Sequence, residues 1–400
     1  MHATSESVLI IGAGLGGLAL AQGLKKHGIP LRIFERDLTN DYRAQGYRLR
    51  LYHDGVDALQ SVLSPDLYSS FEETCVPTNL GPIPEFDAQT ASVNNPDMSA
   101  GRPGVDAKTA DRTVLREILR VGIDIVYGKI LLRYEVQEDC ITAHFADGSS
   151  ASGSLLVAAD GARSVIRKQY LPNLKPLDTC SRGIFGKTLI TPELLSATSS
   201  DLLGRMCVIK DHANSNFFNM LLQETNWPQR GSWGQRYPTL PADYIYWVLR
   251  GPKEAYSLPD SKLLQLSNEE AAECAIEATR HWHPTFRALT HYQTTNNSAV
   301  LRICSMPPRL PVWEASRRIT LLGDAVHVMS PASASGAATA FMDAACLVDC
   351  LVDGGFCKES IARYEEEMRA FAGAAIQRGV EGGQVHFGQR PMEKYEETDM

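Results

Sequence analysis

Three glycines near the start of the chain have the spacing of a site that holds a dinucleotide. Gly12, Gly14 and Gly17 form a G-x-G-x-x-G pattern directly after the apolar run Val8–Ile11. In such a turn the first glycine permits the tight bend, the second lets the backbone approach a pyrophosphate, and the third lets a helix pack on the strand. The amide groups at the helix N-terminus then face the phosphates. The pattern predicts a strand, turn and helix that bind NAD or FAD.

A carboxylate at the end of the next predicted strand fits the same site. The run Leu31–Phe34 leads to Glu35, about twenty residues beyond the glycines, where an acid can accept hydrogen bonds from a ribose diol. Both NAD and FAD carry a free 2′-hydroxyl, so this segment does not choose between them. The alternative is that the glycines form an ordinary tight turn of another α/β protein and that Glu35 is a solvated acid.

Two further acids follow apolar runs that are suited to buried strands. Asp160 ends the run Leu155–Ala159, and Asp324 follows Leu322 and Gly323. At the end of a buried strand, the oxygens of Asp324 can accept hydrogen bonds from a polyol, which FAD carries and NAD lacks. The alternative for both acids is a helix cap or a turn.

Basic and small residues complete the set of candidate binding groups. Arg112 opens a predicted helix and can pair with a diphosphate from the side opposite the glycine turn; the alternative is a surface arginine. All nine residues that follow Pro331, up to Ala340, are Ala, Ser, Gly or Thr. Because such side chains contribute little apolar burial, their density indicates that a backbone or a flat ligand comes close.

The composition is that of an ordinary globular protein. The 400 residues are 44% hydrophobic and 22% charged, and a net charge of −8 disfavours nucleic acid as the main partner. We find no signal-peptide pattern and no apolar run of the roughly eighteen residues that a membrane span needs, so we expect a cytoplasmic protein. The nine cysteines include no C-x-x-C pair, which gives no indication of a metal site or a disulfide framework. The sequence does not indicate an oligomeric state.

The order of the elements predicts an α/β protein with an insertion. Strand and helix patterns alternate in the first part of the chain, residues 77–108 resemble a long irregular excursion, and longer strand patterns follow. We therefore expect a dinucleotide-binding domain in two parts, residues 1–175 and 301–355, around a mostly antiparallel sheet domain at residues 176–300. A C-terminal helical segment is expected at residues 356–400.

Taken in this order, the motifs resemble those of the single-component FAD-dependent aromatic monooxygenases of the para-hydroxybenzoate hydroxylase type, and among them the salicylate-hydroxylase-like enzymes. The resemblance spans nearly the whole chain. It implies a Rossmann-like FAD-binding domain, an inserted sheet domain that binds substrate, and a C-terminal helix. The resemblance assigns the following residues to the FAD site: Gly12, Gly14, Gly17, Glu35, Arg36, Arg112, Asp160, Gly323, Asp324, Pro331, Gly336, Ala337 and Ala338.

The resemblance also implies a reaction. In this family NADPH or NADH acts as a transient reductant of FAD, O₂ adds to form a C4a-hydroperoxide, and an electron-rich substrate is hydroxylated or epoxidised. We expect a hydrophobic aromatic, polyketide-derived or terpenoid-derived metabolite, bound between the flavin and the inserted sheet. Arg48 is the candidate catalytic residue, placed to pair with a phenolate or with the flavin; the alternative is a solvated strand residue.

One segment departs from the family's pattern. Where the family commonly has G-x-G-x-N, this chain has Ala334-Ser-Gly-Ala-Ala338, so the first glycine and the asparagine are missing. Alanine restricts φ and lacks the amide side chain. The departure leaves open a flavin-binding scaffold or cyclase in which FAD is structural. A flavin halogenase is disfavoured because the W-x-W-x-I-P signature is absent, and an NAD dehydrogenase because the Gly-Asp motif favours FAD.

Overall fold

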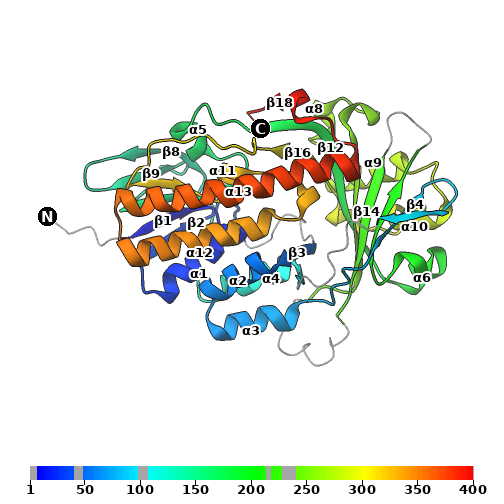
Figure 1. Cartoon of the computed structure of the whole chain (residues 1–400), viewed down its shortest axis with the longest axis horizontal. Coiled ribbons are helices and arrows are strands. Elements are labelled where there is room, and N and C mark those ends of the chain that lie inside the picture. The colour runs from blue at the N-terminus through cyan, green and yellow to red at the C-terminus, as the bar shows by residue number, and fades with distance from the viewer. Residues whose placement is uncertain (1–6, 40–47, 98–106, 213–217, 228–239, 400) are drawn as a thin grey trace.

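A five-stranded parallel sheet forms the centre of one half of the molecule (Figure 1). The computed structural model describes residues 7–39, 48–97, 107–212, 218–227 and 240–399. The strand order is β17-β11-β1-β2-β7, so segments far apart in the sequence lie side by side. The strands are β1 (Val8–Ile11), β2 (Leu31–Phe34), β7 (Ile125–Val126), β11 (Leu155–Ala158) and β17 (Ile319–Leu321).

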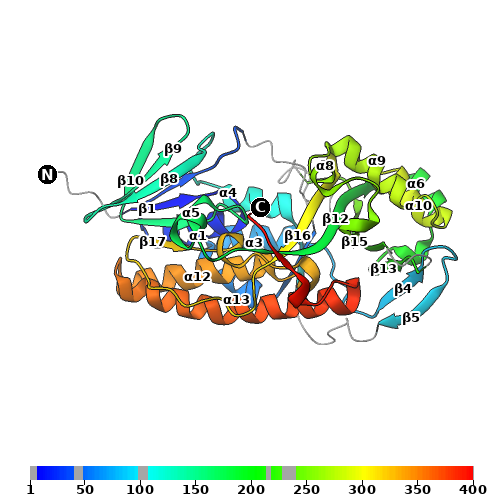
Figure 2. The same ribbon diagram turned by 90° about the horizontal axis from the view of Figure 1, so that it is seen from above.

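Helices cover one face of this sheet and a small second sheet covers the other, as Figure 2 shows. On the helical face are α1 (Leu15–Lys26), α12 (Gly336–Gly354) and α13 (Lys358–Phe387). On the other face is an antiparallel meander of β8 (Leu131–Val136), β9 (Ile141–Phe145) and β10 (Ser150–Gly153).

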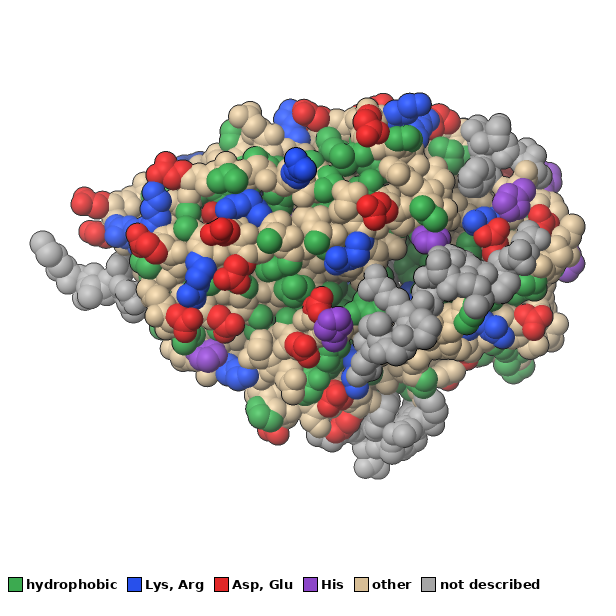
Figure 3. Space-filling view, in the orientation of Figure 1, with side chains coloured by type: hydrophobic (Ala, Val, Ile, Leu, Met, Phe, Trp, Pro, Cys, Tyr) green, Lys and Arg blue, Asp and Glu red, His purple; other side chains and the backbone are tan. Residues whose placement is uncertain are grey.

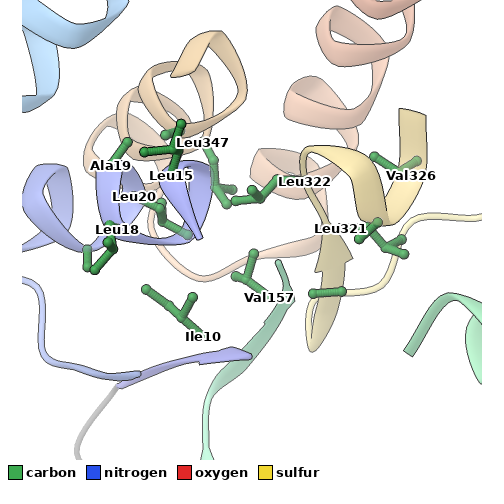
Figure 4. Close-up of a cluster of buried hydrophobic side chains, with 14 of the residues drawn as sticks. Ile10, Leu15, Leu18, Ala19, Leu20, Val157, Leu321, Leu322, Val326 and Leu347 are labelled. Carbon is green, nitrogen blue, oxygen red and sulfur yellow. The ribbon is translucent and has the colours of Figure 1, made fainter. Parts of the chain in front are cut away.

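Apolar side chains from the strands and the helices meet between these layers. Ile10 and Val157 from the sheet and Leu18, Leu20 and Leu347 from the helices belong to one buried cluster (Figure 4). Complete burial of a side chain of this size stabilises the fold by about 1.5–3 kcal/mol. Because both faces of the parallel strands are covered, they are apolar along their whole length, as the sequence pattern predicts.

A two-stranded ribbon and several shorter helices connect this half to the rest of the molecule. The ribbon pairs β3 (Arg48–Tyr52) with β6 (Ala107–Asp111) in antiparallel fashion. The helices are α2 (His53–Val62), α3 (Pro65–Thr74), α4 (Arg112–Arg120), α5 (Val165–Tyr170) and α11 (Asp324–His327). Arg48, Arg112 and Asp324 are the first residues of β3, α4 and α11.

A larger, mostly antiparallel sheet forms the other half, with the order β16-β12-β15-β14-β13-β4-β5 and with β18 paired to β12. All neighbours are antiparallel except β13 and β4. The strands are β4 (Ile83–Asp87), β5 (Val93–Asp97), β12 (Leu177–Leu189), β13 (Met206–Lys210), β14 (Asn219–Thr225), β15 (Tyr244–Pro252), β16 (Ala299–Ser305) and β18 (Glu396–Glu397). The helices α6 (Pro192–Ala197), α8 (Asp260–Leu263), α9 (Asn268–Ala278) and α10 (Pro284–His291) lie on the side away from the parallel sheet (Figure 2).

The fold class expected from the sequence is confirmed, with one local error. The expected irregular excursion at residues 77–108 contains β4 and β5, which extend the antiparallel sheet. Phe86 of β4 is buried against Phe286 of α10, with ring centroids 5.9 Å apart. Both strands were missed because the Pro, Asn and Asp residues in and around them are uncommon in strands. In addition, β13, one partner of β4, lies more than a hundred residues away, whereas β5 pairs with β4. The four-segment domain division remains a proposal. The antiparallel sheet also includes β4, β5 and β18, which lie outside residues 176–300.

The face of the molecule shown in Figure 3 carries no large patch of a single charge sign. Acidic and basic side chains alternate over the face shown in Figure 3. No helix among the described residues is long and apolar enough to cross a bilayer.

Candidate active site

A cavity of about 830 Å³ lies between the parallel-sheet half and the antiparallel sheet. The first half contributes the N-terminal turn of α1, Arg112, Asp324 and the segment from Pro331 to Ala337 to its wall. The antiparallel sheet contributes apolar and aromatic side chains from the opposite side, including Phe185 and Tyr246. Both the candidate cofactor residues and the candidate substrate wall therefore face one space.

The glycine turn has the geometry that its spacing predicts. Gly12 has φ +108°, and a Cβ there would lie 2.2 Å from the carbonyl oxygen of Ala159. A Cβ on Gly17 would lie 2.1 Å from the carbonyl oxygen of Gly12. Gly14, in contrast, has no atom within 4 Å of its Cβ position and lines the cavity. Gly12 and Gly17 are therefore needed for close packing of β1, α1 and β11, whereas Gly14 leaves an open cradle.

The N-terminus of α1 opens into this cradle. Its N-cap, Gly14, provides no side-chain hydrogen bond, and Leu15, Gly16 and Gly17 line the cavity. Backbone N–H groups at such an end are free to bind an anion, and the helix dipole favours negative charge there. The observed cradle fits a pyrophosphate.

Glu35 lies directly behind the turn. Its Oε2 accepts a hydrogen bond from the amide of Ala13 at 2.8 Å, and its Oε1 accepts one from the amide of Asp37 at 3.1 Å. The side chain is buried and is not among the residues that line the cavity. Arg36 is exposed and is also outside the cavity wall. The structure therefore shows Glu35 fixing the glycine turn, and its contact with a ribose remains a proposal.

Asp324 is presented to the cavity by a tight turn at Gly323. Gly323 has φ +62°, and its amide donates to Oδ2 of Asp343 at 2.7 Å. The same oxygen is 2.6 Å from Nε2 of His327, and both side chains of this pair are completely buried. The Asp324 side chain is accessible from the cavity, but its depth in the fold reduces its hydration and raises the pKa of its carboxyl above the usual range, against the charges of His327 and Arg112. Asp343 thus fixes the position from which Asp324 reaches the cavity.

Sequence reasoning missed Asp343. The available signal was a single acid in the apolar segment Phe341–Leu347 of α12. Such a residue is costly to bury unless it is paired, so an acid at this place indicates a partner elsewhere in the fold.

Asp111 also escaped the sequence analysis, although it holds Arg112 in place. Its Oδ1 accepts hydrogen bonds from the amides of Thr113 and Val114 at 2.8 and 3.1 Å, which caps α4. Its Oδ2 accepts from Nζ of Lys187 at 3.2 Å and from the hydroxyl of Tyr244 at 2.7 Å. This buried carboxylate therefore joins the start of α4 to the antiparallel sheet and places Arg112 between the two halves.

Asp160 makes a helix-capping contact, which is the alternative to a cofactor role. Its Oδ2 accepts from the amide of Val165 at 2.9 Å, and it does not line the cavity, although Gly161 does. Burial raises the pKa of this carboxyl above its usual range. Nearby, Arg167 is buried and donates to the carbonyl oxygens of Ala325 and Ala162 at 2.9 and 2.7 Å. The Asp-Gly motif therefore lies against the Gly-Asp turn, and the cofactor role of Asp160 itself remains a proposal.

The small side chains from Pro331 to Ala338 allow other groups to come close to the backbone on two sides. Pro331, Gly336 and Ala337 line the cavity. Ala338 does not; it lies so close to Gly55 of α2 that a Cβ on that glycine would be 2.6 Å from the Ala338 Cβ. The small side chains therefore admit a ligand on one side and neighbouring helices on the other.

Ala334 occupies a backbone conformation that favours glycine. It has φ +52° and ψ +26°, the left-handed region, at the position where the resembled family commonly has glycine. We expect Ala334→Gly to stabilise the protein by roughly 0.5–1 kcal/mol, because relief of the strained φ exceeds the entropy that glycine adds to the unfolded chain. Chemical denaturation checks this expectation. The control Ala337→Gly, within α12, is expected to destabilise by up to about 1 kcal/mol; equal effects at both positions would contradict the strain argument.

Arg48 lies in the cavity wall. It is buried at the start of β3, beside Tyr246 of β15, and burial lowers the pKa of its guanidinium to about 10. This placement differs from the alternative of a solvated strand residue. Its role toward a substrate or the flavin remains a proposal.

Comparison with known proteins connects this geometry to a family. Residues 310–379 match the model of an FAD binding domain. The chain is 36% identical, over 98% of its length, to the dual O-methyltransferase/FAD-dependent monooxygenase elcB of Phaeosphaeria nodorum, of which it covers 47%. It is 28% identical to the FAD-dependent monooxygenase thnD of Trichoderma harzianum, with 94% of this chain and 91% of that protein covered. The chain thus spans about half the length of the first of these curated relatives.

A solved structure shows the same relationship over nearly the whole length of both chains. A protein of Photorhabdus luminescens described as an FAD-containing monooxygenase has 30% identity and a TM-score of 0.78, with 96% of this chain and 100% of that chain covered. The glycine cradle, the Asp324 turn and the small-residue segment around one cavity fit the cofactor that these proteins share. The chain therefore belongs to the family of FAD-dependent monooxygenases, and FAD is its cofactor.

Proposed function

We propose that this enzyme uses NADPH or NADH and O₂ to hydroxylate or epoxidise a hydrophobic aromatic, polyketide-derived or terpenoid-derived metabolite. The observation that carries the proposal is the single cavity that contains both the cofactor cradle and an apolar wall. Phe185, Leu221 and Val248 of the antiparallel sheet line this wall. A concave site with apolar lining and a few polar groups is typical of small-molecule binding.

The chain offers a separate group for each part of FAD. Gly14 and the N-terminus of α1 would hold the pyrophosphate, with Arg112 adding a positive charge from the other side. Asp324 would accept hydrogen bonds from the ribityl hydroxyls, and the segment from Pro331 to Ala337 would lie beside the flavin ring. When bound, FAD supplies the redox chemistry by accepting a hydride equivalent and activating oxygen for transfer.

The protein's own contribution is to position charges and to exclude water. The amide groups at the N-terminus of α12, whose N-cap Ser335 makes no side-chain cap, would stabilise negative charge on a ligand in the cavity. The apolar sheet wall, together with Val328 and Met329, would exclude water from the side of a bound ligand that packs against it.

A visible spectrum of the purified protein followed by anaerobic titration with NADPH tests the proposal. Flavin peaks that bleach with NADPH and return with air would support a redox-active cofactor. If NADPH does not bleach the flavin in the presence of any of a panel of aromatic candidate substrates, the proposed reaction is wrong. That result would support the alternative in which FAD is structural. Because the name of elcB joins O-methyltransferase and monooxygenase activities, the panel includes each phenol together with its methyl ether.

Loss of the Asp324 carboxylate is expected to weaken FAD binding. Hydrogen bonds to a charged group contribute about 1.5–3 kcal/mol, so Asp324→Ala should raise the FAD dissociation constant roughly 10-fold to 100-fold. Fluorescence titration of the FAD-free protein measures this constant. Glu366→Ala, an exposed acid on α13, is the control and should leave it unchanged. An unchanged constant for Asp324→Ala, with normal thermal unfolding, would remove Asp324 from the cofactor site.

A further inference from the structure

Two cysteines on one face of α12 lie beside a glutamate of α13. Cys346 and Cys350 are four residues apart in α12, so their side chains are neighbours on the helix surface. The two Sγ atoms and a carboxylate oxygen of Glu367 all lie within 4.8 Å of one another. The thiol of Cys346 donates to Oε2 of Glu367 at 3.4 Å. Three groups that can bind a metal ion therefore converge from two helices that lie side by side (Figure 1).

The distances between these atoms suit a tetrahedral zinc ion. Zinc lies about 2.3 Å from a cysteine sulfur and about 2.0–2.2 Å from a carboxylate oxygen, which places a sulfur and an oxygen ligand about 3.5 Å apart. The 3.4 Å between Sγ of Cys346 and Oε2 of Glu367 matches this separation. Two sulfur ligands of one ion are about 3.8 Å apart, so the two thiols need to approach each other by at most about 1 Å.

The cluster lies at the surface and is open on one side. Cys350 is buried, Cys346 is partly buried and Glu367 is exposed. The helices therefore hold the two sulfur atoms, while an ion can enter past the glutamate and keep a water molecule as its fourth ligand. Thiolate ligands favour zinc and other soft cations over magnesium and calcium.

The charges around the thiols also favour a cation. Asp353 and Glu367 are close enough to act electrostatically on Asp349, which directly precedes Cys350. Against these three acids stands Arg363, whose Nε donates to Sγ of Cys350 at 3.1 Å and whose Nη2 pairs with Asp353 at 3.2 Å. Because Arg363 is exposed, its guanidinium can keep the contact with Asp353 while a cation takes its place at the sulfur.

We propose that Cys346, Cys350 and Glu367 bind one thiophilic divalent cation, with Zn²⁺ as the ion that fits best, and that this ion joins α12 to α13. The spacing of the cysteines does not reveal the site, because the third ligand comes from another helix. Gly336 lines the large cavity and lies ten residues before Cys346, a rise of about 15 Å along α12. The inference therefore concerns a structural site outside the cavity and does not depend on the proposed reaction.

Zinc titration of the FAD-loaded protein tests the site directly. With the thiols kept reduced, isothermal titration calorimetry should show one tightly bound zinc ion per chain. X-ray absorption at the zinc edge should then show two sulfur ligands at about 2.3 Å and oxygen ligands at about 2.0–2.2 Å. Zinc should also raise the midpoint of thermal unfolding, because an ion that binds the folded arrangement stabilises it.

Substitutions assign the bound zinc to this cluster. Changes to groups that only support a metal ligand cost about 10-fold to 100-fold in affinity, so loss of a sulfur ligand in Cys346→Ser should cost at least roughly 100-fold. Glu367→Gln changes an exposed side chain, which leaves the fold intact, and should weaken binding at least roughly 10-fold. The matched controls are Cys140→Ser, in a turn, and Glu366→Gln, the neighbouring exposed acid; both should bind zinc as the wild type does.

The variant Arg363→Gln tests the electrostatic part of the argument. It removes the positive charge that competes for Sγ of Cys350, and should tighten zinc binding roughly 3-fold to 10-fold. Weaker binding would show that the ion does not replace the guanidinium at this sulfur, and would overturn the assignment.

The remaining outcomes are equally decisive. If the wild-type protein binds no zinc at micromolar concentrations, or binds it through nitrogen and oxygen ligands alone, the proposed site is wrong. It is also wrong if Cys346→Ser and Glu367→Gln bind zinc as tightly as the wild type, since the ion then lies elsewhere. Reduction of the flavin by NADPH should be normal in all these variants. A failure of that reduction in the wild type would contradict the proposed function and would leave the zinc measurements unaffected.

Discussion

Gly17→Ala is expected to destabilise the protein by about 3 kcal/mol or more, because the added methyl group meets backbone that cannot move. Its carbon would lie 2.1 Å from the carbonyl oxygen of Gly12 and 3.1 Å from the Cβ of Ala159. Overpacked cores normally cost about 1–3 kcal/mol, and a contact with backbone rather than with a flexible side chain belongs at or above the upper end of that range. Separation of α1 from β1 and β11 would also open the cradle. Chemical denaturation of the FAD-free protein measures the loss directly.

Gly14→Ala is the matched control for this substitution. No atom lies within 4 Å of the added carbon, and the extended backbone of Gly14, with φ −73° and ψ −177°, is available to alanine. We therefore expect normal stability and a higher FAD dissociation constant, since the methyl group projects into the cavity. If Gly17→Ala unfolds with the same midpoint as the wild-type protein, the packing role that we assign to this glycine is wrong.

These two glycines illustrate what a local pattern can predict. The turn, the helix after it and the buried strands follow from short-range rules, so the sequence placed β1, α1, β2, β11 and β17 nearly correctly. The identity of Gly12, Gly14 and Gly17 as a binding turn was also predicted, because their spacing determines the backbone geometry. The different tasks of the three glycines became clear only from the atoms that surround each one.

The residues that escaped prediction depend on contacts between distant segments. Asp343 acquires its role only from His327 and Gly323, and Asp111 only from Lys187 and Tyr244, which lie far from it in the sequence. No periodicity within a strand or helix encodes such pairs. The strand β4 was missed for the same reason, because it pairs with β13 and its Phe86 packs on α10. The strand β5 pairs locally with β4 and was missed because its sequence Val-Asn-Asn-Pro-Asp is poor in strand-forming residues.

His327→Leu is expected to be the most damaging change outside the glycine turn. In the wild-type protein His327 and Asp343 are both completely buried, with Nε2 and Oδ2 2.6 Å apart. Within the part of the chain that the structure describes, leucine would leave the Asp343 carboxylate with the amide of Gly323 as its one hydrogen-bond partner. Breaking a buried pair by removing one member costs about 3–5 kcal/mol, since an uncompensated charge remains. Thermal and chemical unfolding of the FAD-free protein would show this loss.

A double variant distinguishes the unpaired charge from simple loss of packing. Asp343→Asn keeps an oxygen for the Gly323 amide and removes the charge, so His327→Leu combined with Asp343→Asn should recover a large part of the lost stability. A double-mutant cycle then gives the coupling between the two positions. If the double variant is as unstable as the sum of the single ones, the buried charge is not the cause.

The same pair predicts how the loss depends on pH. Burial alone would lower the pKa of His327, but the charge of Asp343 and their hydrogen bond outweigh burial and raise it above the ordinary value of 6.5. A raised pKa in the folded state means that the imidazolium stabilises the fold below pH 6.5 and that this contribution fades as pH rises through the folded-state pKa. The stability gap between wild type and His327→Leu should therefore narrow as the pH rises above 6.5. A gap that stays constant would show that His327 does not titrate in this range, and the pair would then act as a neutral imidazole that donates to a carboxylate.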